Sequence, residues 1–305
     1  MKEYTLPDVE ALGLPISQET AFTTPKGLYN EKIEKRQRKM LEKYETVLKQ
    51  FLELGEEILL AMRGCSPTSL VEQVTSGWTT FFLKRCVLVV TNRRILHFPS
   101  RVNFSPRHSV AQIRFDDVES ITLASLFRRR FTVKYKNGKK ETFRSLNESK
   151  KLKAIIPELQ LGGERTTLFR MRHHLCPKCA FPLESKVSKC SKCGLGFKRT
   201  GAAAFFSILL PGGGYFYTRH PFLGILGALG EIILVGLFVF SHRVTFFEAV
   251  DPARRQMIPL VLGVVFLFAK IIAVYHAIHF AKEYIPLERL PQSRNPQGDI
   301  VAPGE

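Results

Sequence analysis

The last third of the sequence contains two apolar segments that are long enough to cross a lipid bilayer. Residues 221–240 carry one charge, Glu231, and residues 256–281 carry one, Lys270. At 1.5 Å per helical residue, twenty residues span about 30 Å, the thickness of the hydrocarbon core. These segments predict a protein anchored in a membrane rather than a simple cytosolic globule.

A third uncharged segment, residues 201–217, is interrupted by the run Pro211-Gly212-Gly213-Gly214. It is either a short first span or a re-entrant segment. We expect a helical transmembrane bundle over residues 200–283 with two or three spans. Three is the favoured number, because the basic residues at 198–199 and in the loop 241–255 then face the cytoplasm. Three spans place the C-terminal tail outside, whereas a re-entrant segment places it inside.

The two charges within the apolar segments are predicted to meet. Consecutive antiparallel helices would bring Glu231 and Lys270 together near mid-membrane. Either charge alone is costly in lipid, and pairing removes much of that cost. The predicted intramembrane ion pair has a structural role or belongs to a proton or substrate path.

Charge is segregated along the chain. Residues 1–200 hold 37 basic and 20 acidic residues, a net charge of +17, whereas the remainder holds 8 and 7. The first thirty residues lack the basic start and apolar stretch of a signal peptide, so we expect the N-terminal region to stay in the cytoplasm. Residues 1–28 are predicted to be a flexible arm and residues 284–305 a disordered tail.

Four of the six cysteines form two Cys-x2-Cys pairs, Cys176 with Cys179 and Cys190 with Cys193, separated by ten residues. Four thiolates at this spacing suit a closed tetrahedral Zn²⁺ site, here a short zinc ribbon over residues 173–199. A redox dithiol and an iron site are the alternatives. A closed site leaves no coordination position for catalysis, so the zinc is expected to be structural.

Other residues around this motif have simpler interpretations. Gly194 follows the second pair, where a tight knuckle needs a positive φ. His173 and His174 are alternative ligands or solvent-facing side chains, and Cys65 and Cys86 are predicted to be buried thiols. Thiolates that hold zinc require a reducing compartment, and sparse cysteines exclude a secreted disulfide scaffold.

An amphipathic helix is predicted over residues 29–54, with Gly55 as its stop. It is expected to pack on its own domain or to form a dimeric coiled coil, which would make the protein a homo-oligomer. Its apolar seam, interrupted by Gln37, consists of Ile33, Met40, Tyr44, Val47, Phe51 and Leu54.

Residues 56–145 are predicted to form short β-strands, and Asn137-Gly138 is the strongest hairpin signal among them. A helix over residues 147–160 follows, capped by Asn147 or Ser149. The pattern predicts a small antiparallel barrel or a split sandwich closed by one helix. The expected strands are Glu56–Met62, Leu70–Gly77, Thr79–Arg85, Val87–Thr91, Arg94–Phe98, Val110–Phe115, Val118–Leu123, Phe131–Lys136 and Lys140–Phe143.

Three strings in this region, CVLVVTNRRILHF (86–98), RFDDVESITL (114–123) and FTVKYKNGKKETF (131–143), precede the terminal helix. Together they resemble a bacterial pleckstrin-homology or GRAM-type domain over residues 55–160. The resemblance implies a small β-barrel with a C-terminal helix. The insert at Pro99–Ser109 departs from the pattern and leaves the pairing of the middle strands open. The apolar string SILLPGGGYFYTRHPFLGILG (207–227) resembles small bacterial membrane hairpins, a likeness that implies no chemistry.

Basic residues cluster in the predicted loops of this domain, where a membrane-tethered domain would meet anionic headgroups. They form a solvated surface, a surface for anionic lipid or, less in keeping with the pattern of aromatic residues, a nucleic-acid surface. The candidate residues are Lys84, Arg85, Arg93, Arg94, Arg128, Arg129 and Arg130.

Common catalytic motifs, such as a phosphate-binding Gly-Lys-Ser/Thr loop or His-Glu-x-x-His, are missing from the sequence. We therefore expect a non-enzymatic, multidomain α+β protein of the inner membrane with its N-terminal domains in the cytoplasm. Its expected role is binding or scaffolding through anionic lipid or a protein partner. The alternatives are a transport or channel component that uses Glu231 and Lys270, and a membrane-tethered nucleic-acid binder.

Overall fold

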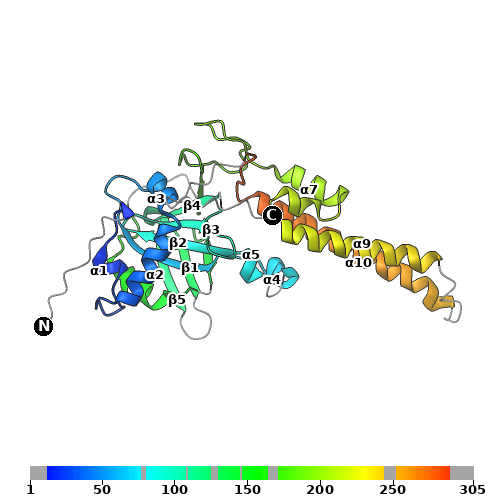
Figure 1. Ribbon diagram of the computed structural model, residues 1–305, viewed down its shortest axis with the longest axis horizontal. Coiled ribbons are helices and arrows are strands. Elements are labelled where there is room, and N and C mark those ends of the chain that lie inside the picture. The colour runs from blue at the N-terminus through cyan, green and yellow to red at the C-terminus, as the bar shows by residue number, and fades with distance from the viewer. Residues whose placement is uncertain are drawn as a thin grey trace. The chain divides into compact units, whose positions relative to one another are not determined.

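The computed structural model describes residues 12–76, 80–107, 109–124, 130–144, 146–163, 171–243 and 252–288. The chain divides into two compact units. The first consists of residues 1–185, 190–194 and 288–305, and the second of residues 186–189 and 195–287. The first unit is a mixture of sheets and helices, whereas the second is helical (Figure 1).

The first unit contains two antiparallel sheets. The larger has the strand order β1-β2-β3-β4-β8 and the smaller has the order β5-β6-β7. An isolated bridge between Cys65 and Arg144 links them, and the described strands do not close into one barrel. The strands are β1 (Ile58–Cys65), β2 (Arg85–Thr91), β3 (Arg94–Pro99), β4 (Val110–Arg114), β5 (Val118–Ala124), β6 (Arg130–Tyr135), β7 (Lys140–Phe143) and β8 (His173–Leu175).

Strands β1 to β7 coincide with predicted strands because their local signals are strong. The apolar run of β2 is buried and pairs with β3 across the turn at Asn92-Arg93. The Asn137-Gly138 turn joins β6 to β7, and Gly138 has a φ of +80°, which only glycine adopts readily. Strand β8 has only three residues and was not predicted.

Two predicted strands, Leu70–Gly77 and Thr79–Arg85, are wrong, because these segments form helices α4 (Leu70–Ser76) and α5 (Thr80–Leu83). Ser69 and Glu72 form a capping box. The amide of Glu72 donates to Ser69 Oγ over 3.1 Å, and the amide of Ser69 donates to Glu72 Oε2 over 2.9 Å. These bonds pair two backbone amides at the start of α4 that would otherwise lack a partner. The segment is therefore helical although its residues favour a strand.

The predicted helix 29–54 is two helices, α2 (Glu31–Glu42) and α3 (Glu45–Phe51). Asn30 caps α2 by accepting the amide of Ile33. Tyr44 and Phe51 are buried against Phe98 of the larger sheet, with ring centroids 5.3 and 6.4 Å apart. Most of the seam thus packs on the chain's own sheet, and a coiled coil through these side chains would have to expose this core. Leu54, predicted as its last member, lies beyond α3 and is 98% exposed.

Gln37, which interrupts the seam, protects the outer edge of β1. Its side-chain amide donates to the carbonyl of Ala61 over 2.8 Å, and its oxygen accepts the amide of Ala61 over 3.2 Å. Asn147 accepts the amide of Arg63 over 2.7 Å farther along the same strand. These side chains replace a neighbouring strand and block edge-to-edge association.

The expected flexible arm 1–28 is ordered where it is described. Leu12, Leu14, Ile16 and Phe22 are buried, and the amide of Ile58 donates to the carbonyl of Pro15 over 2.8 Å. Apolar residues at positions 12, 14 and 16 alternate like a strand and join the core formed with α2 and α3. A short helix, α1 (Gln18–Ala21), follows. Residues 1–11 lie outside the described part.

The larger sheet separates two apolar cores. One lies between this sheet and helices α1 to α3. The other contains side chains of both sheets and of α6 (Ser149–Ile155), including Phe131, Leu152 and Ile155. Two 3-10 turns, η3 (Phe115–Asp117) and η4 (Ile156–Glu158), complete this unit.

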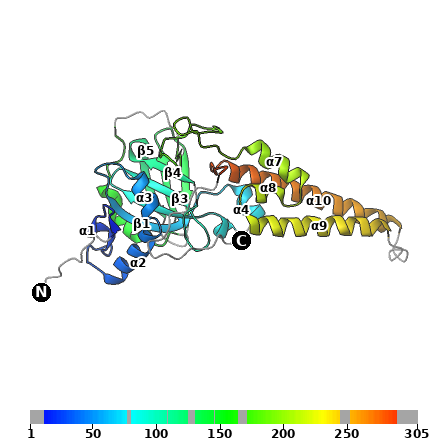
Figure 2. The ribbon, with the colours of Figure 1, turned by 45° about the horizontal axis from the view of Figure 1, so that its top comes forward.

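The second unit contains α7 (Thr200–Leu209), α8 (Gly213–Tyr217), α9 (Pro221–Arg243) and α10 (Pro252–Ala281). Helices α9 and α10 run side by side (Figure 2). By length and composition, residues 221–241 and 257–281 could each cross a membrane. Helix α7 has ten residues, about 15 Å, and is too short for the favoured third span.

Candidate metal centre and polar clusters

The four cysteines of the predicted ribbon meet in one cluster. Their sulfur atoms lie within 4.8 Å of one another, with 3.5 Å between Cys176 and Cys193 and 3.6 Å between Cys179 and Cys190. A tetrahedron with metal–sulfur bonds of about 2.3 Å has sulfur–sulfur edges of about 3.8 Å. The cluster therefore has the size of a four-thiolate metal site.

The two pairs adopt the same local conformation. The amide of Ala180 donates to the carbonyl of Cys176, and that of Gly194 donates to the carbonyl of Cys190, both over 2.9 Å. Ala180 has a φ of +56° and Gly194 a φ of +71°. The sequence predicts a positive φ only at Gly194, because glycine favours this conformation and alanine ordinarily does not.

Backbone amides face the sulfur atoms, as a metal-binding knuckle requires. Burial raises the pKa of the Cys176 thiol, whereas the amides of Lys178 and Cys179 donate to it and act in the opposite direction. At Cys190, burial raises the pKa but hydrogen bonds from backbone amides, with Cys193 first, outweigh it and lower the pKa to about 7. These hydrogen bonds make the Cys190 thiol easier to deprotonate than an ordinary cysteine.

The first cysteine pair is attached directly to the larger sheet. Strand β8, which ends one residue before Cys176, pairs with β4 through Leu175 and Val110. Gln50 of α3 donates to the carbonyl of Pro177 over 3.1 Å, and Ala180 packs against the core. The metal centre is therefore part of the first unit's packing.

The histidines before the cluster lie elsewhere. His173 is buried in β8, with Nε2 3.6 Å from Asp117 Oδ2, and burial lowers its pKa to about 4. Neither His173 nor His174 belongs to the group of candidate ligands found among the described residues. Among the described residues, the candidate ligands are therefore the four cysteines.

Two of the basic residues predicted to face anions are buried in ion pairs, so that prediction is wrong for them. Lys84 lies 3.0 Å from Glu72 with both side chains buried. Arg94 binds Glu56 over 2.6 Å, and although burial raises the pKa of Glu56, this guanidinium holds it below its usual value. The sequence around each position gives no sign of the carboxylate that pairs with it, because Glu72 and Glu56 are distant along the chain.

The remaining candidates have different surroundings. Arg93 is exposed and lies 3.9 Å from Glu53. Arg130 begins β6 and is half-buried, and Arg128 and Arg129 lie outside the described residues. Arg85 remains at the surface, where its guanidinium carbon lies 4.7 Å from the ring of Phe82.

Arg85 belongs to a basic-aromatic patch that the sequence did not reveal. We define this patch as Arg63, Phe82, Arg85, Val102 and Phe104. The guanidinium carbons of Arg63 and Arg85 lie 4.7 and 5.1 Å from the ring centre of Phe104. Arg85 also donates to the carbonyl of Val102, whose side chain is 60% exposed. Phe104 lies between β3 and β4, in the segment 99–109.

A buried serine–histidine contact also occurs in the first unit. Ser66 Oγ lies 2.8 Å from Nε2 of His97, and Arg172 Nη1 lies 3.0 Å from its Nδ1. Nη1 of Arg172 also lies 3.3 Å from Nε2, so one guanidinium faces both ring nitrogens. Ser66 and His97 are both buried, so the contact is a polar link inside the first unit.

In the second unit, Glu231 of α9 and Lys270 of α10 form an ion pair over 2.6 Å. Lys270 also donates to the backbone carbonyl of Ser207 in α7 over 3.0 Å. Glu231 is buried and Lys270 is largely buried. The structure thus brings together the two predicted charges and adds a third helix to them.

No protein-family model matches the sequence, and no curated protein matches it. The fold and the site define a mixed α+β unit with a four-cysteine centre that could hold a metal ion. They also define a helical unit with two apolar helices that could cross a membrane.

Proposed function

We propose that this chain is a non-enzymatic, multi-pass protein of the inner membrane whose first unit binds anionic lipid on the cytoplasmic side. The observation that carries the proposal is the basic-aromatic patch beside an exposed apolar side chain, in a chain that also has two apolar helices. Arginines near an anionic membrane contribute about 1 kcal/mol each, and aromatic side chains prefer the interface.

We propose that the first unit is a pleckstrin-homology-like or GRAM-like module whose sheets stay open instead of closing into the expected barrel. Strands β1 to β4 and β5 to β7 are two successive antiparallel meanders, and α6 follows the last strand. The helix after the last strand agrees with the resemblance, whereas the closed barrel that the resemblance implies is replaced by two open sheets. The addition of β8 to the larger sheet departs from that pattern.

We propose that the four cysteines hold one structural Zn²⁺ ion. Four sulfur ligands in a tetrahedral cluster favour zinc or iron. We choose zinc because it has no redox chemistry and binds stably to the reduced thiolates of a reducing compartment. Metal analysis of the purified chain should find about one zinc per molecule. Iron in its place, with the visible absorption of iron thiolates, would contradict the zinc assignment.

The lipid proposal can be tested on the full chain in nanodiscs by hydrogen exchange. Amides in residues 80–85 and 100–107 should exchange more slowly in discs with phosphatidylglycerol than in neutral discs. High salt should abolish the difference, because it screens exposed charges. Equal exchange in both discs would show that anionic lipid is not the ligand and would favour a protein partner.

A charge reversal at the patch provides the matched comparison. The double variant Arg63→Glu with Arg85→Glu should lose the protection in anionic discs. Lys139→Glu makes a charge change of the same sign in the exposed β6–β7 turn and should keep it. If Lys139→Glu lowers protection equally, the effect reflects net charge and not this patch.

The transport alternative makes a different demand on Glu231 and Lys270. A path needs both charges, whereas an anchor needs only that neither is left unpaired. Glu231→Leu combined with Lys270→Leu should therefore leave the amount of chain in the membrane fraction unchanged. Lys270→Leu alone should reduce it. Loss of a transport activity in the double variant would instead support a path.

The nucleic-acid alternative concerns the basic residues that flank the cysteine cluster. It predicts that the zinc-loaded chain shifts labelled DNA with a steep dependence on salt. We expect no such shift, because the described aromatic residues of the patch are paired with arginines rather than arranged as a stacking platform.

A further inference from the structure

The beginning of α7, the end of α8 and the end of α10 lie at the same end of the helical unit, which we call the base. The amide of Lys198 donates to the carbonyl of Ile285 over 2.9 Å, and its side chain donates to the carbonyl of Tyr217. The amide of Arg199 donates to Tyr217 Oη over 3.1 Å, and Arg219 donates to the carbonyl of Leu287. The chain therefore enters α7 at the base and, after the turn, returns to the base at the end of α8.

The turn between α7 and α8 fits closely against the two long helices. A Cβ atom on Gly212 would lie 2.1 Å from the carbonyl oxygen of Gly224 in α9. One on Gly214 would lie 2.7 Å from the Cβ of Ala277 in α10 and closer still to Ser207. Gly212 also has a φ of +64°. The glycine run thus allows a sharp reversal inside the helix bundle.

A charge stabilises the last turn of α7 at Ser207, which is buried. The last carbonyls of a helix have no partner within it, and in lipid each unpaired group costs several kcal/mol. Lys270 donates to one of them, at Ser207, and its ammonium also lies at the negative end of the helix dipole. Glu231 then compensates the charge of Lys270.

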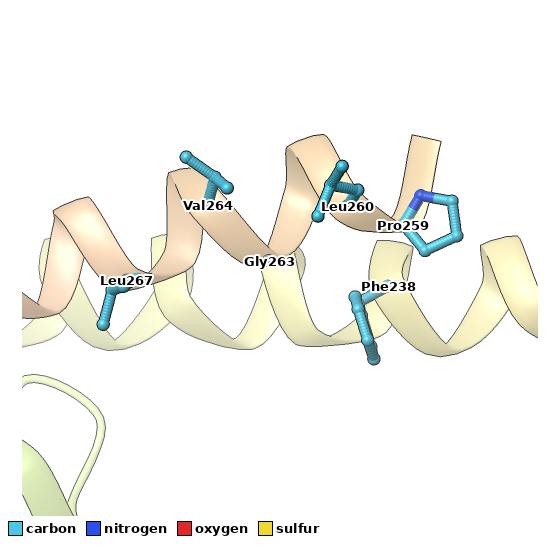
Figure 3. A pocket seen from close by; sticks show the side chains of 6 residues that line it. All are labelled: Phe238, Pro259, Leu260, Gly263, Val264 and Leu267. Atoms are coloured by element: carbon cyan, nitrogen blue, oxygen red, sulfur yellow. The ribbon is translucent and has the colours of Figure 1, made fainter. Parts of the chain in front are cut away.

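Within the apolar segments 221–240 and 257–281, the polar side chains lie in the half that is nearer the base. Tyr215 and His276 hydrogen-bond over 3.1 Å, and Thr218 is buried near His220. Beyond Glu231 and Lys270, residues 232–240 and 257–269 are all apolar. Figure 3 shows this far half, where an open apolar groove is lined by Phe238, Pro259, Leu260, Gly263, Val264 and Leu267.

The outer surface of α7 is apolar as well. Phe205, Ile208 and Leu209 are 59 to 66% exposed. This surface is continuous with the apolar helices α9 and α10 in the same unit, and its length of about 15 Å matches one leaflet of a 30 Å core. An apolar surface of this length fits the acyl chains of a single leaflet.

From these observations we infer that α7 and α8 form a re-entrant hairpin in one leaflet, so that the chain crosses the membrane only twice. The inference rests on the proposed membrane anchoring. The hairpin occupies the leaflet on the side from which the chain arrives at Lys198. It follows that the first unit and the C-terminal tail lie on the same side and that the loop 244–251 lies on the other.

The test places epitope tags on the full chain at the N-terminus, within the loop 244–251 and after Glu305. Sealed vesicles of known orientation are then treated with protease. A re-entrant hairpin predicts that the two terminal tags are cleaved together and that the loop tag has the opposite sidedness. Three spans predict the reverse, with the loop tag following the N-terminal tag and the C-terminal tag opposite, and would overturn the inference.

The comparison of the two terminal tags remains decisive even if the loop insertion prevents folding, because it needs no insertion. If the tagged chain does not sediment with membranes, the proposed anchoring fails together with the hairpin. If it sediments and the terminal tags lie on opposite sides, only the hairpin is overturned.

Discussion

The glycine that follows the second cysteine pair shows how a local backbone conformation shapes the candidate metal site. Gly194 has a φ of +71°, and no atom lies within 4 Å of the position that a Cβ would take. Gly194→Ala should therefore lower the free energy of unfolding through backbone strain alone, by about 1 kcal/mol, and weaken metal binding. Chemical unfolding of the zinc-loaded chain measures this. Unchanged stability would contradict the left-handed knuckle.

A second prediction at the residue scale concerns acid stability. Burial, followed by the nearby charges of Arg172, His174 and Lys84, holds the pKa of His97 well below its usual value. In the unfolded chain this histidine takes up a proton below about pH 6.5. Because the unfolded state then binds more protons, the free energy of unfolding should fall by about 1.4 kcal/mol per pH unit as the pH drops below this value.

His97→Gln should reduce this slope between pH 6.5 and 5, as measured by denaturant midpoints at a series of pH values. Acid release of metal is common to both proteins and cancels in the comparison. His173, whose pKa is lowered to about 4, keeps a residual slope in the variant. Identical slopes in the two proteins would show that His97 is protonated in the fold.

At the scale of elements, the glycine run between α7 and α8 carries a steric prediction. Gly212→Ala would place a Cβ 2.1 Å from a carbonyl oxygen of α9 in a left-handed conformation, so it should cost about 2 kcal/mol or more. Gly236→Ala on α9 meets nothing within 4 Å and is the matched control. Loss of helical circular dichroism in a detergent titration measures both, and equal effects would contradict the close packing.

At the scale of the whole molecule, the metal should stabilise the first unit. The first cysteine pair continues strand β8, and Ala180 packs against the core of this unit. A strong chelator should lower the thermal midpoint of the wild-type chain, because bound metal stabilises only the folded state. The variant Cys176→Ser should start at the lower midpoint and should not respond to the chelator.

Cys65→Ser provides the control for this experiment, since Cys65 is buried outside the cluster. It should keep the metal and its response to the chelator. A wild-type chain that loses its metal without any change in midpoint would show that the ribbon folds independently of the sheet.

Local patterns in the sequence were sufficient where the chemistry is local. The spacing of the cysteines specified the cluster, because two residues between ligands can direct both thiols to one point. The long apolar runs specified α9 and α10, and the single charges within them specified the pair of Glu231 and Lys270. Apolar alternation and the Asn137-Gly138 turn specified most of the strands.

Tertiary structure decided what depends on distant partners. The carboxylates of Glu72 and Glu56 draw Lys84 and Arg94 inside, and the patch around Phe104 joins residues from β1, α5, β2 and the insert. Ala180 is left-handed because its knuckle requires it. The apolar seam of α2 and α3 packs against the larger sheet. Lys270 determines where α7 ends, because the buried carbonyl of Ser207 needs a hydrogen-bond donor and no local sequence pattern can supply one.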